Sequence, residues 1–241
     1  GNVAVSIAFS DLAGNAGDAV TATTNSSSVT YDRAVPTLSA VTVTSNNDNS
    51  AYAKEGDIVT LSFTSSENLQ SDPTVTIDGN AATVSGSNTT WTAAYTMQSG
   101  DTEGDVNFTI DFLDLASNSG SRVTTLTSGD KIVYDETVPT LPTVDISSNN
   151  SNGATFAKVG DVITISVSAS ENIQTPTVTI AGNAAAIATG SNGERVYTAT
   201  YTMQSSDNTG VIPFTVDFSD MANNAGTQVT AVANDSDGGV T

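Results

Sequence analysis

A period of 103 residues constrains the fold of this chain more than any other feature of its sequence. The segment YDRAVPTL at residues 31–38 returns as YDETVPTL at residues 134–141, and residues 1–32 match residues 104–135 without a gap. A repeat of this length has the size of a small domain. We therefore predict a row of similar domains: the last third of one copy in residues 1–32, a complete copy in residues 33–135 and another in residues 136–241. We also expect the natural protein to contain the earlier part of the first copy.

Within each copy, short apolar segments alternate with polar turns. IVTLSF at residues 58–63 places apolar side chains on one face and Thr and Ser on the other, as a strand beside a core does. Residues 45–57 are expected to form a long polar turn, and the last strand of this copy is expected to begin near Val123. No helical period is present. About seven short segments per hundred residues predict an all-β fold of tandem immunoglobulin-like antiparallel β-sandwich domains in an elongated array.

A few single positions carry more specific predictions. Asp78 and Gly79 predict a tight hairpin turn. Pro213 lacks an amide proton for the ladder of a sheet, so we expect it directly at the start of a strand. Trp91 and its counterpart Tyr197 lie in step with inward-facing residues, which favours a core aromatic over a surface that stacks on sugars.

The charge balance excludes several classes of partner. Lys and Arg number 6 and Asp and Glu number 26, which gives a net charge of −20. Nucleic acid and anionic membranes would be repelled, and no apolar run approaches the 18 or so residues that span a bilayer. The chain has no His and no Cys, so the usual general base and any thiol chemistry are missing. We expect a protein that is not an enzyme and whose small partners are cations.

The loops of an immunoglobulin-like sandwich suggest where a cation would bind. The loop after the second strand and the loop of the last hairpin lie at the end where the chain enters, and they carry Asp and Glu in both complete copies. Oxygen atoms of several carboxylates and an amide at one place suit Ca²⁺, which takes 6–8 oxygens. The predicted calcium residues are Asp32, Glu67, Asp114 and Asn118 in one copy, and Asp135, Glu136, Glu171, Asp220 and Asn224 in the next. The opposite end of the preceding domain can add Asp101, Glu103 or Asp105.

The same residues also have an interpretation without metal. Asp and Asn in loops commonly cap turns through their side chains, and Asp32 and Asp135 can be solvated residues of a tether. Asp57 and Asp161 are expected to be turn residues only. In the first copy Asp11 and the Asn at position 15 keep the pattern without a companion loop, so a site there would be incomplete.

Four motifs recur in fixed order: Asp-x-x-x-Pro-Thr at the junctions, Ala-Lys-x-Gly-Asp at residues 53–57 and 157–161, Ser-Glu-Asn at residues 66–68 and 170–172, and Asp-x-Ala-x-Asn at residues 114–118 and 220–224. With this order, the chain resembles the bacterial immunoglobulin-like tandem repeats of giant surface adhesins and RTX-type biofilm proteins. The resemblance implies an extracellular location at the bacterial cell surface, Ca²⁺ at the junctions between domains, and neighbouring repeats of the same chain as partners.

The resulting hypothesis is a non-catalytic spacer or stalk that calcium makes rigid. One alternative is a segment of an extracellular filament or surface layer, in which other copies would pack against this one. Another is a module that binds glycan or protein; such a module would carry a loop unlike its siblings, whereas here the largest difference is GSNGER at residues 190–195 against GSNTT.

Overall fold

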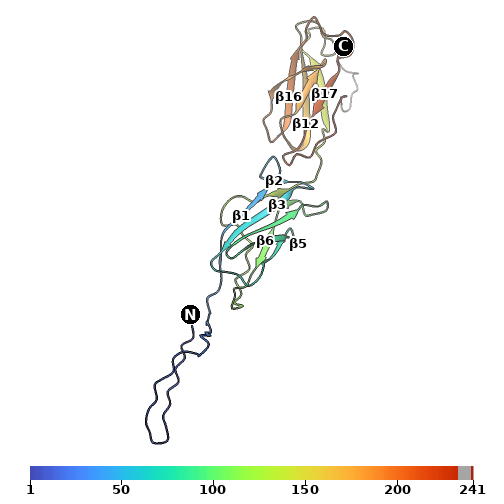
Figure 1. Ribbon diagram of the computed structural model, residues 1–241. Coiled ribbons are helices and arrows are strands. Elements are labelled where there is room, and N and C mark those ends of the chain that lie inside the picture. Colours follow the sequence, from blue (N-terminus) through green and yellow to red (C-terminus); the bar gives the residue numbers. More distant parts are fainter. Residues whose placement is uncertain (233–239, 241) are drawn as a thin grey trace. The chain divides into compact units, whose positions relative to one another are not determined.

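The structure, a computed structural model, describes residues 1–232 and residue 240, and all its regular secondary structure is β-strand (Figure 1). The predicted all-β fold is confirmed. Nowhere in this described part does a helix occur that could span a membrane.

The chain divides into two compact units. One consists of Gly1–Thr42, Leu61–Ala94 and Asn107–Gly129, and the other of Val43–Thr60, Tyr95–Val106 and Asp130–Thr241. These bounds differ from those of the sequence repeats, because parts of residues 33–135 group with the copy that follows. The domain boundaries at residues 33 and 136 therefore stay predictions. The predicted end of the last copy falls partly on residues 233–239 and 241, which lie outside the described residues.

The copy in residues 33–135 has a four-stranded antiparallel sheet and two three-stranded sheets. The order of the first is β1-β3-β7-β6, that of the second β5-β4-β9 and that of the third β2-β10-β8. The bounds are β1 Leu38–Ser45, β2 Tyr52–Ala53, β3 Ile58–Ser65, β4 Thr74–Ile77, β5 Asn80–Ala81, β6 Thr83–Ser87, β7 Thr90–Thr96, β8 Gly104–Asp105, β9 Phe108–Asp111 and β10 Val133–Tyr134.

The next copy repeats the two main sheets, with the orders β11-β12-β16-β15 and β14-β13-β17 (Figure 1). Their strands are β11 Thr143–Ser148, β12 Val162–Ile173, β13 Thr177–Ile180, β14 Asn183–Ala184, β15 Ala186–Thr189, β16 Glu194–Thr202 and β17 Phe214–Asp217. Two sheets of this kind in each copy agree with the predicted antiparallel β-sandwich.

The alternating apolar residues form the cores, as their period of two predicts. In the first unit Leu61, Phe63 and Ile110 are almost completely buried, and in the second Ile163 and Ile165 are. Burial of such side chains is the main force that holds a sandwich together.

Two of the single-residue predictions concern aromatic side chains and are confirmed. Trp91 is 4% exposed and Tyr197 is 1% exposed, so both are core residues. The Tyr197 hydroxyl donates to the carbonyl oxygens of Ser191 and Ile173.

The predictions for backbone positions are confirmed as well. Pro213 immediately precedes β17. Asp78 and Gly79 have φ angles of 48° and 79° between β4 and β5, which is the turn that tight hairpins favour.

Two expectations about segments are wrong. Residues 45–57 are not only a turn, because they contain β2, which pairs with β10 in parallel. A two-residue strand is too short to show an alternation in the sequence. Val123 forms a single bridge with Ile110, and regular pairing near the end of this copy begins only at β10.

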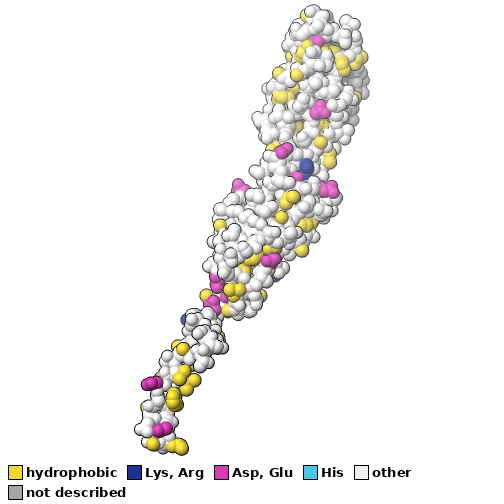
Figure 2. Space-filling model, viewed as in Figure 1, with side chains coloured by type: hydrophobic (Ala, Val, Ile, Leu, Met, Phe, Trp, Pro, Cys, Tyr) yellow, Lys and Arg dark blue, Asp and Glu magenta, His cyan; other side chains and the backbone are white. Residues whose placement is uncertain are grey.

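Residues 1–32 form an open hairpin without a regular strand. Isolated bridges join Asn2 to Thr30, Ile7 to Val20 and Ser10 to Ala16. Its large apolar side chains are exposed, and Figure 2 shows them gathered along this hairpin.

Candidate metal sites

The chain segment that enters each copy is tied to the end of the long central strand or to the residue directly after it. In the first unit the amide of Thr37 donates to the Ser66 hydroxyl oxygen at 3.0 Å, and the amide of Ser66 donates to the Thr37 carbonyl at 2.8 Å. In the second unit Thr140 and Ser170 exchange the same two bonds, at 2.9 Å each. Ser66 and Ser170 directly precede the predicted calcium ligands Glu67 and Glu171, so these bonds hold each Glu beside the entering tether.

The last-hairpin loop is brought to the same place by backbone bridges. Leu69 pairs with Asp114, and Ile173 pairs with Asp220. The loop also reaches the tether: the side-chain amide of Asn224 donates to the carbonyl of Asp135 at 2.8 Å. Its counterpart Asn118 approaches the carbonyl of Asp32 at 3.4 Å.

These ties produce two equivalent groups of carboxylates, one in each unit. Cluster 1 consists of Asp32, Glu67 and Asp114, and cluster 2 consists of Asp135, Glu171 and Asp220; in each, one oxygen of every carboxylate lies within 4.8 Å of the others. Two oxygens bound to one Ca²⁺ at 2.3–2.6 Å lie at most about 5 Å apart, so the spacing fits that ion. Among the described residues, none of the six carboxylates forms an ion pair with Lys or Arg.

Turn geometry accounts for part of this arrangement. Both Asp114 and Asp220 are completely buried, and the oxygens of Asp114 accept bonds of 2.7–2.8 Å from Ala116 and Asn118. Asp11 accepts the same set from Ala13 and Asn15 at 2.8–2.9 Å, although no second acidic residue joins it in a cluster within the described chain. The Asp-x-Ala-x-Asn motif therefore folds its own loop, as the interpretation without metal requires.

The two Glu residues differ from these aspartates, because no turn explains the position of their carboxylates. Within the described residues, neither the Glu67 nor the Glu171 carboxylate accepts a hydrogen bond. Burial, followed by the charges of Asp32 and Asp114, raises the pKa of Glu67. Burial and the charges of Asp135, Asp220 and Glu103 raise the pKa of Glu171 to about 7. Both carboxylates are held where a negative charge is unfavourable unless a cation is present.

The aspartates of the clusters respond differently to the same surroundings. Burial raises the pKa of Asp114, but the bonds donated by Asn118, Ala116 and Ser117 outweigh it, so the pKa lies below its usual value. Burial raises the pKa of Asp135, with added contributions from the charges of Asp220 and Glu103. Asp114 is thus held as a carboxylate by its own turn, whereas the bond that the Asp135 carboxylate accepts from the Thr137 amide at 3.0 Å does not outweigh its burial.

The other predicted acidic residues divide into two pairs. Glu103 and Glu136 lie near cluster 2: Glu103 accepts bonds from the Thr137 hydroxyl at 2.7 Å and the Glu136 amide at 3.2 Å, and Glu136 accepts one from the Tyr134 hydroxyl at 2.9 Å. Asp101 and Asp105 belong to neither cluster. Asp101 accepts from the Gln98 amide at 2.7 Å, and Asp105 pairs with Lys131 at 2.8 Å.

Some residues near cluster 2 were not predicted. Arg195 shares a hollow with Asp135, Glu171 and Tyr52, and its charge acts against the raised pKa of Glu171. The only signal in the sequence was the unusual GSNGER segment.

A group of asparagines also joins two loops of the second unit. The side-chain amide of Asn47 donates to the Ala222 carbonyl at 2.8 Å, and that of Asn223 donates to the Asn47 side-chain oxygen at 2.8 Å. Asn47 also donates to Asp57 at 2.7 Å, and Asp57 accepts from the Lys54 amide, as expected of a turn residue. Asn-rich loops carry no signal for such contacts, because exposed turns have the same composition.

The geometry thus shows two matching oxygen-rich clusters, each built from a tether residue, a Glu at or just after the end of the central strand and a turn-forming Asp. No protein-family model and no curated protein matches this chain, so the clusters are interpreted from their own geometry.

Proposed function

We propose that this chain consists of non-catalytic spacer repeats of a large extracellular bacterial protein, and that Ca²⁺ bound by clusters 1 and 2 stiffens the repeat array. The observation that carries the proposal is the position of Glu67 and Glu171. Each faces two further carboxylates without a hydrogen-bond donor or an ion pair among the described residues, and the arrangement occurs twice at equivalent places.

The ion would be held by Asp32, Glu67 and Asp114 in cluster 1 and by Asp135, Glu171 and Asp220 in cluster 2. Bound calcium would supply positive charge that offsets the mutual repulsion of the three carboxylates. Each cluster joins a tether residue to the end of the central strand and to the last-hairpin loop of the sandwich. A cation shared by tether and loops would remove conformational freedom from the tether, and this restriction is the physical basis of stiffening.

The surroundings of the clusters support calcium rather than a transition metal. The chain has no His or Cys, and carboxylate oxygens are the ligands that hard cations prefer. Extracellular modules hold Ca²⁺ with dissociation constants of roughly 10⁻⁴–10⁻³ M. The net charge of −20 and the resemblance to repeats of surface adhesins support an extracellular setting.

Calorimetric titration of the whole chain with Ca²⁺, together with thermal melting in calcium and in chelator, tests the proposal. Two binding sites are expected. Calcium at about a hundred times the dissociation constant is expected to stabilise the folded state by about 2.7 kcal/mol at a site. Small-angle scattering should show a more flexible particle in chelator.

Matched variants make this test specific. Glu67→Gln together with Glu171→Gln should abolish the binding heat and the calcium-dependent rise in melting temperature, while leaving the Asp turns intact. Glu55→Gln changes an exposed Glu outside both clusters and should behave like the wild type. A wild-type chain whose melting and scattering are the same in calcium and chelator would refute the proposal.

A further inference from the structure

The N-terminal hairpin, residues 1–32, has the local structure of a sandwich hairpin that is already formed. Ile7 and Val20 exchange backbone bonds of 2.9 and 3.0 Å; the matching pair Ile110 and Val123 exchanges bonds of 2.9 and 3.1 Å. The aromatic ring of Phe9 covers Gly17 so closely that an added Cβ would lie 2.3 Å from it, and Phe112 covers Gly120 in the same way. The hairpin therefore needs no rearrangement to act as the last hairpin of a repeat.

Its apolar face carries Val5 where the complete copies carry Phe108 and Phe214, and it is uncovered. Ile7 is 57% exposed, whereas the matching Ile110 is completely buried. Phe9 is 55% exposed, whereas Phe112 is 5% exposed. The same residue types in the same backbone geometry thus form the core of one copy and a bare surface in the other.

The two complete copies show what pairs with the edge of this hairpin. In one, β4 runs antiparallel to β9; in the next, β13 runs antiparallel to β17 with the same register. The sequence of both edge-pairing strands is Thr-Val-Thr-Ile. In each pair a threonine hydroxyl bonds across the strands: Thr76 with Thr109 at 2.8 Å and Thr179 with Thr215 at 2.7 Å.

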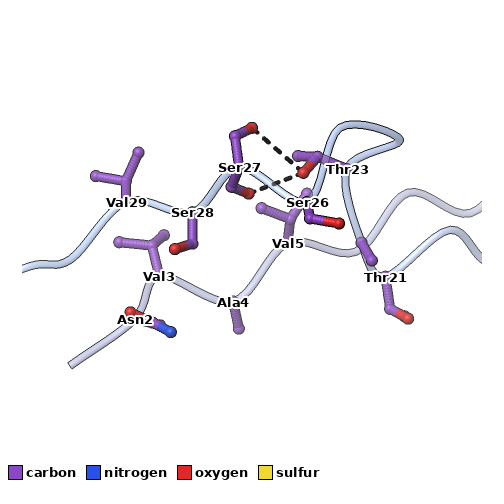
Figure 3. A pocket seen from close by; sticks show the side chains of 11 residues that line it. Asn2, Val3, Ala4, Val5, Thr21, Thr23, Ser26, Ser27, Ser28 and Val29 are labelled. Carbon is purple, nitrogen blue, oxygen red and sulfur yellow. Dashed lines mark hydrogen bonds between the residues drawn. The ribbon is translucent and has the colours of Figure 1, made fainter.

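The hairpin offers the same edge. Residues 5–8 correspond to β9, and Ser6 stands where Thr109 bonds to Thr76, so a hydroxyl is again available. A hollow lies between residues 2–5 and 21–29, and Val3, Val5 and Val29 extend to one side of it (Figure 3). In the complete copy the corresponding arm receives the first strand of the repeat, because the Thr127 amide donates to the Val41 carbonyl at 2.9 Å.

We propose that the open face and edge of the N-terminal hairpin bind the body of a repeat of the kind formed by residues 33–103. The strand Thr74–Ile77 of that body pairs antiparallel with residues 5–8 at the edge of the hairpin, so that Thr76 lies opposite Ser6 and Val75 opposite Ile7. Main-chain bonds at the edge give affinity, and the apolar face gives specificity, as in other cases of strand addition. This surface is separate from clusters 1 and 2 and does not depend on calcium.

Disulfide trapping tests the register, because the chain contains no cysteine of its own. The whole chain carrying Ser6→Cys is mixed, under mild oxidation in chelator, with a polypeptide of residues 33–103 carrying Thr76→Cys. We expect a cross-linked heterodimer, and a several-fold lower yield when Ala8→Cys replaces Ser6→Cys, because position 8 lies two residues out of register. Equal yields, or cross-linked dimers of the whole chain in preference to the heterodimer, would overturn the proposal.

A second test covers the case in which the added polypeptide does not fold by itself. Residues 33–103 are joined in front of Gly1, which reproduces the natural sequence order of residues 103 and 104. Amide hydrogen exchange at Ile7 and Val20 should then slow to the rates of Ile110 and Val123, and Ile7→Asp in the fused chain should restore fast exchange at Val20. Unchanged fast exchange in the fused chain would show that the hairpin does not accept such a body.

Discussion

Clusters 1 and 2 have the same three carboxylates but different surroundings. Glu67 of cluster 1 is affected by burial and by its two companions, whereas Glu171 of cluster 2 also experiences the charge of Glu103 and has a pKa of about 7. The bond from the loop to the tether is 2.8 Å in cluster 2 and 3.4 Å in cluster 1. The repeated motif thus places three carboxylates together in both units, and in cluster 2 the charge of Glu103 adds to their mutual repulsion.

Replacing the Glu of either cluster should have the largest effect on calcium binding. Glu171→Gln is expected to weaken calcium binding at cluster 2 at least about tenfold, since it deletes one of three carboxylate ligands from a site that needs 6–8 oxygens. Glu67→Gln should do the same at cluster 1 alone. Calorimetry of each variant should show one remaining calcium site. Loss of both sites in one variant would contradict the independence of clusters 1 and 2.

Acid should affect cluster 2 more than cluster 1. Calcium competes with the proton on Glu171, whose pKa is about 7 without metal. Lowering the pH from 8 to 6 is therefore expected to weaken binding at cluster 2 about tenfold. Repeating the titrations at both pH values in the Glu67→Gln chain measures this effect, and an affinity independent of pH would rule out the raised pKa as the cause.

Without calcium the same carboxylate should destabilise the fold at neutral pH. The folded-state pKa of Glu171 lies above its usual value of 4.5, so its contribution to stability is largest below pH 4.5 and is lost as the pH rises through about 7. In chelator at pH 8, Glu171→Gln should raise the free energy of unfolding by about 1 kcal/mol, a value reduced for partial exposure. Melting curves should show this gain shrinking toward pH 5; a gain that is the same at both pH values would have another origin.

Glu103→Gln should make the electrostatic surroundings of Glu171 in cluster 2 more like those of Glu67 in cluster 1. Without this charge the pKa of Glu171 should fall, since Glu103 is one of the groups that raise it. Calcium affinity should fall only about threefold, because Glu103 is outside the three-carboxylate group. Carboxyl NMR titration of Glu171 reports the pKa directly. Asp105→Asn, which changes an acidic residue two positions away in β8, serves as the control and should leave that pKa unchanged.

The smallest effect is expected from the asparagines that tie loop to tether. Asn224→Ala removes the 2.8 Å bond to the Asp135 carbonyl and a bond to Asp220 and should cost about 1 kcal/mol. Asn118→Ala should cost a few tenths of a kcal/mol less, because its bond to the Asp32 carbonyl is longer. Denaturant unfolding in chelator compares the two, and an equal or larger loss for Asn118→Ala would show that the tether bond is not the cause.

Much of the fold followed from the sequence because its signals are local. The alternation in residues 58–63 predicted a strand with one buried face, and the Asp78-Gly79 pair predicted a tight turn. The short strand β2 was missed, since two residues cannot show a period and its partner β10 lies about eighty residues away in the chain. Pairing between such distant segments is decided by the completed sheet and not by local preference.

For the candidate sites, too, the sequence predicted one part and the tertiary structure determined the other. The sequence indicated, through the expected immunoglobulin-like topology, which loops would meet, and the acidic residues that it predicted include all six carboxylates that the structure brings together in clusters 1 and 2. It could not separate Asp114, which its own turn holds as a carboxylate, from Glu171, whose charge is unfavourable where it lies. That separation depends on burial and on charges from other segments.

The strand pattern and the turn residues follow from the sequence, because each depends on residues close together in the chain. The acidic residues of clusters 1 and 2 could be named because they stand at matching places in the repeat. Tertiary structure decided which apolar faces are covered and which carboxylates carry an uncompensated charge. Ile7 and Ile110 occupy equivalent positions of the repeat and form matching backbone bonds, yet one is exposed and the other is buried. Burial and electrostatic interaction are properties of what lies opposite a residue in space, and only the assembled sheets determine that.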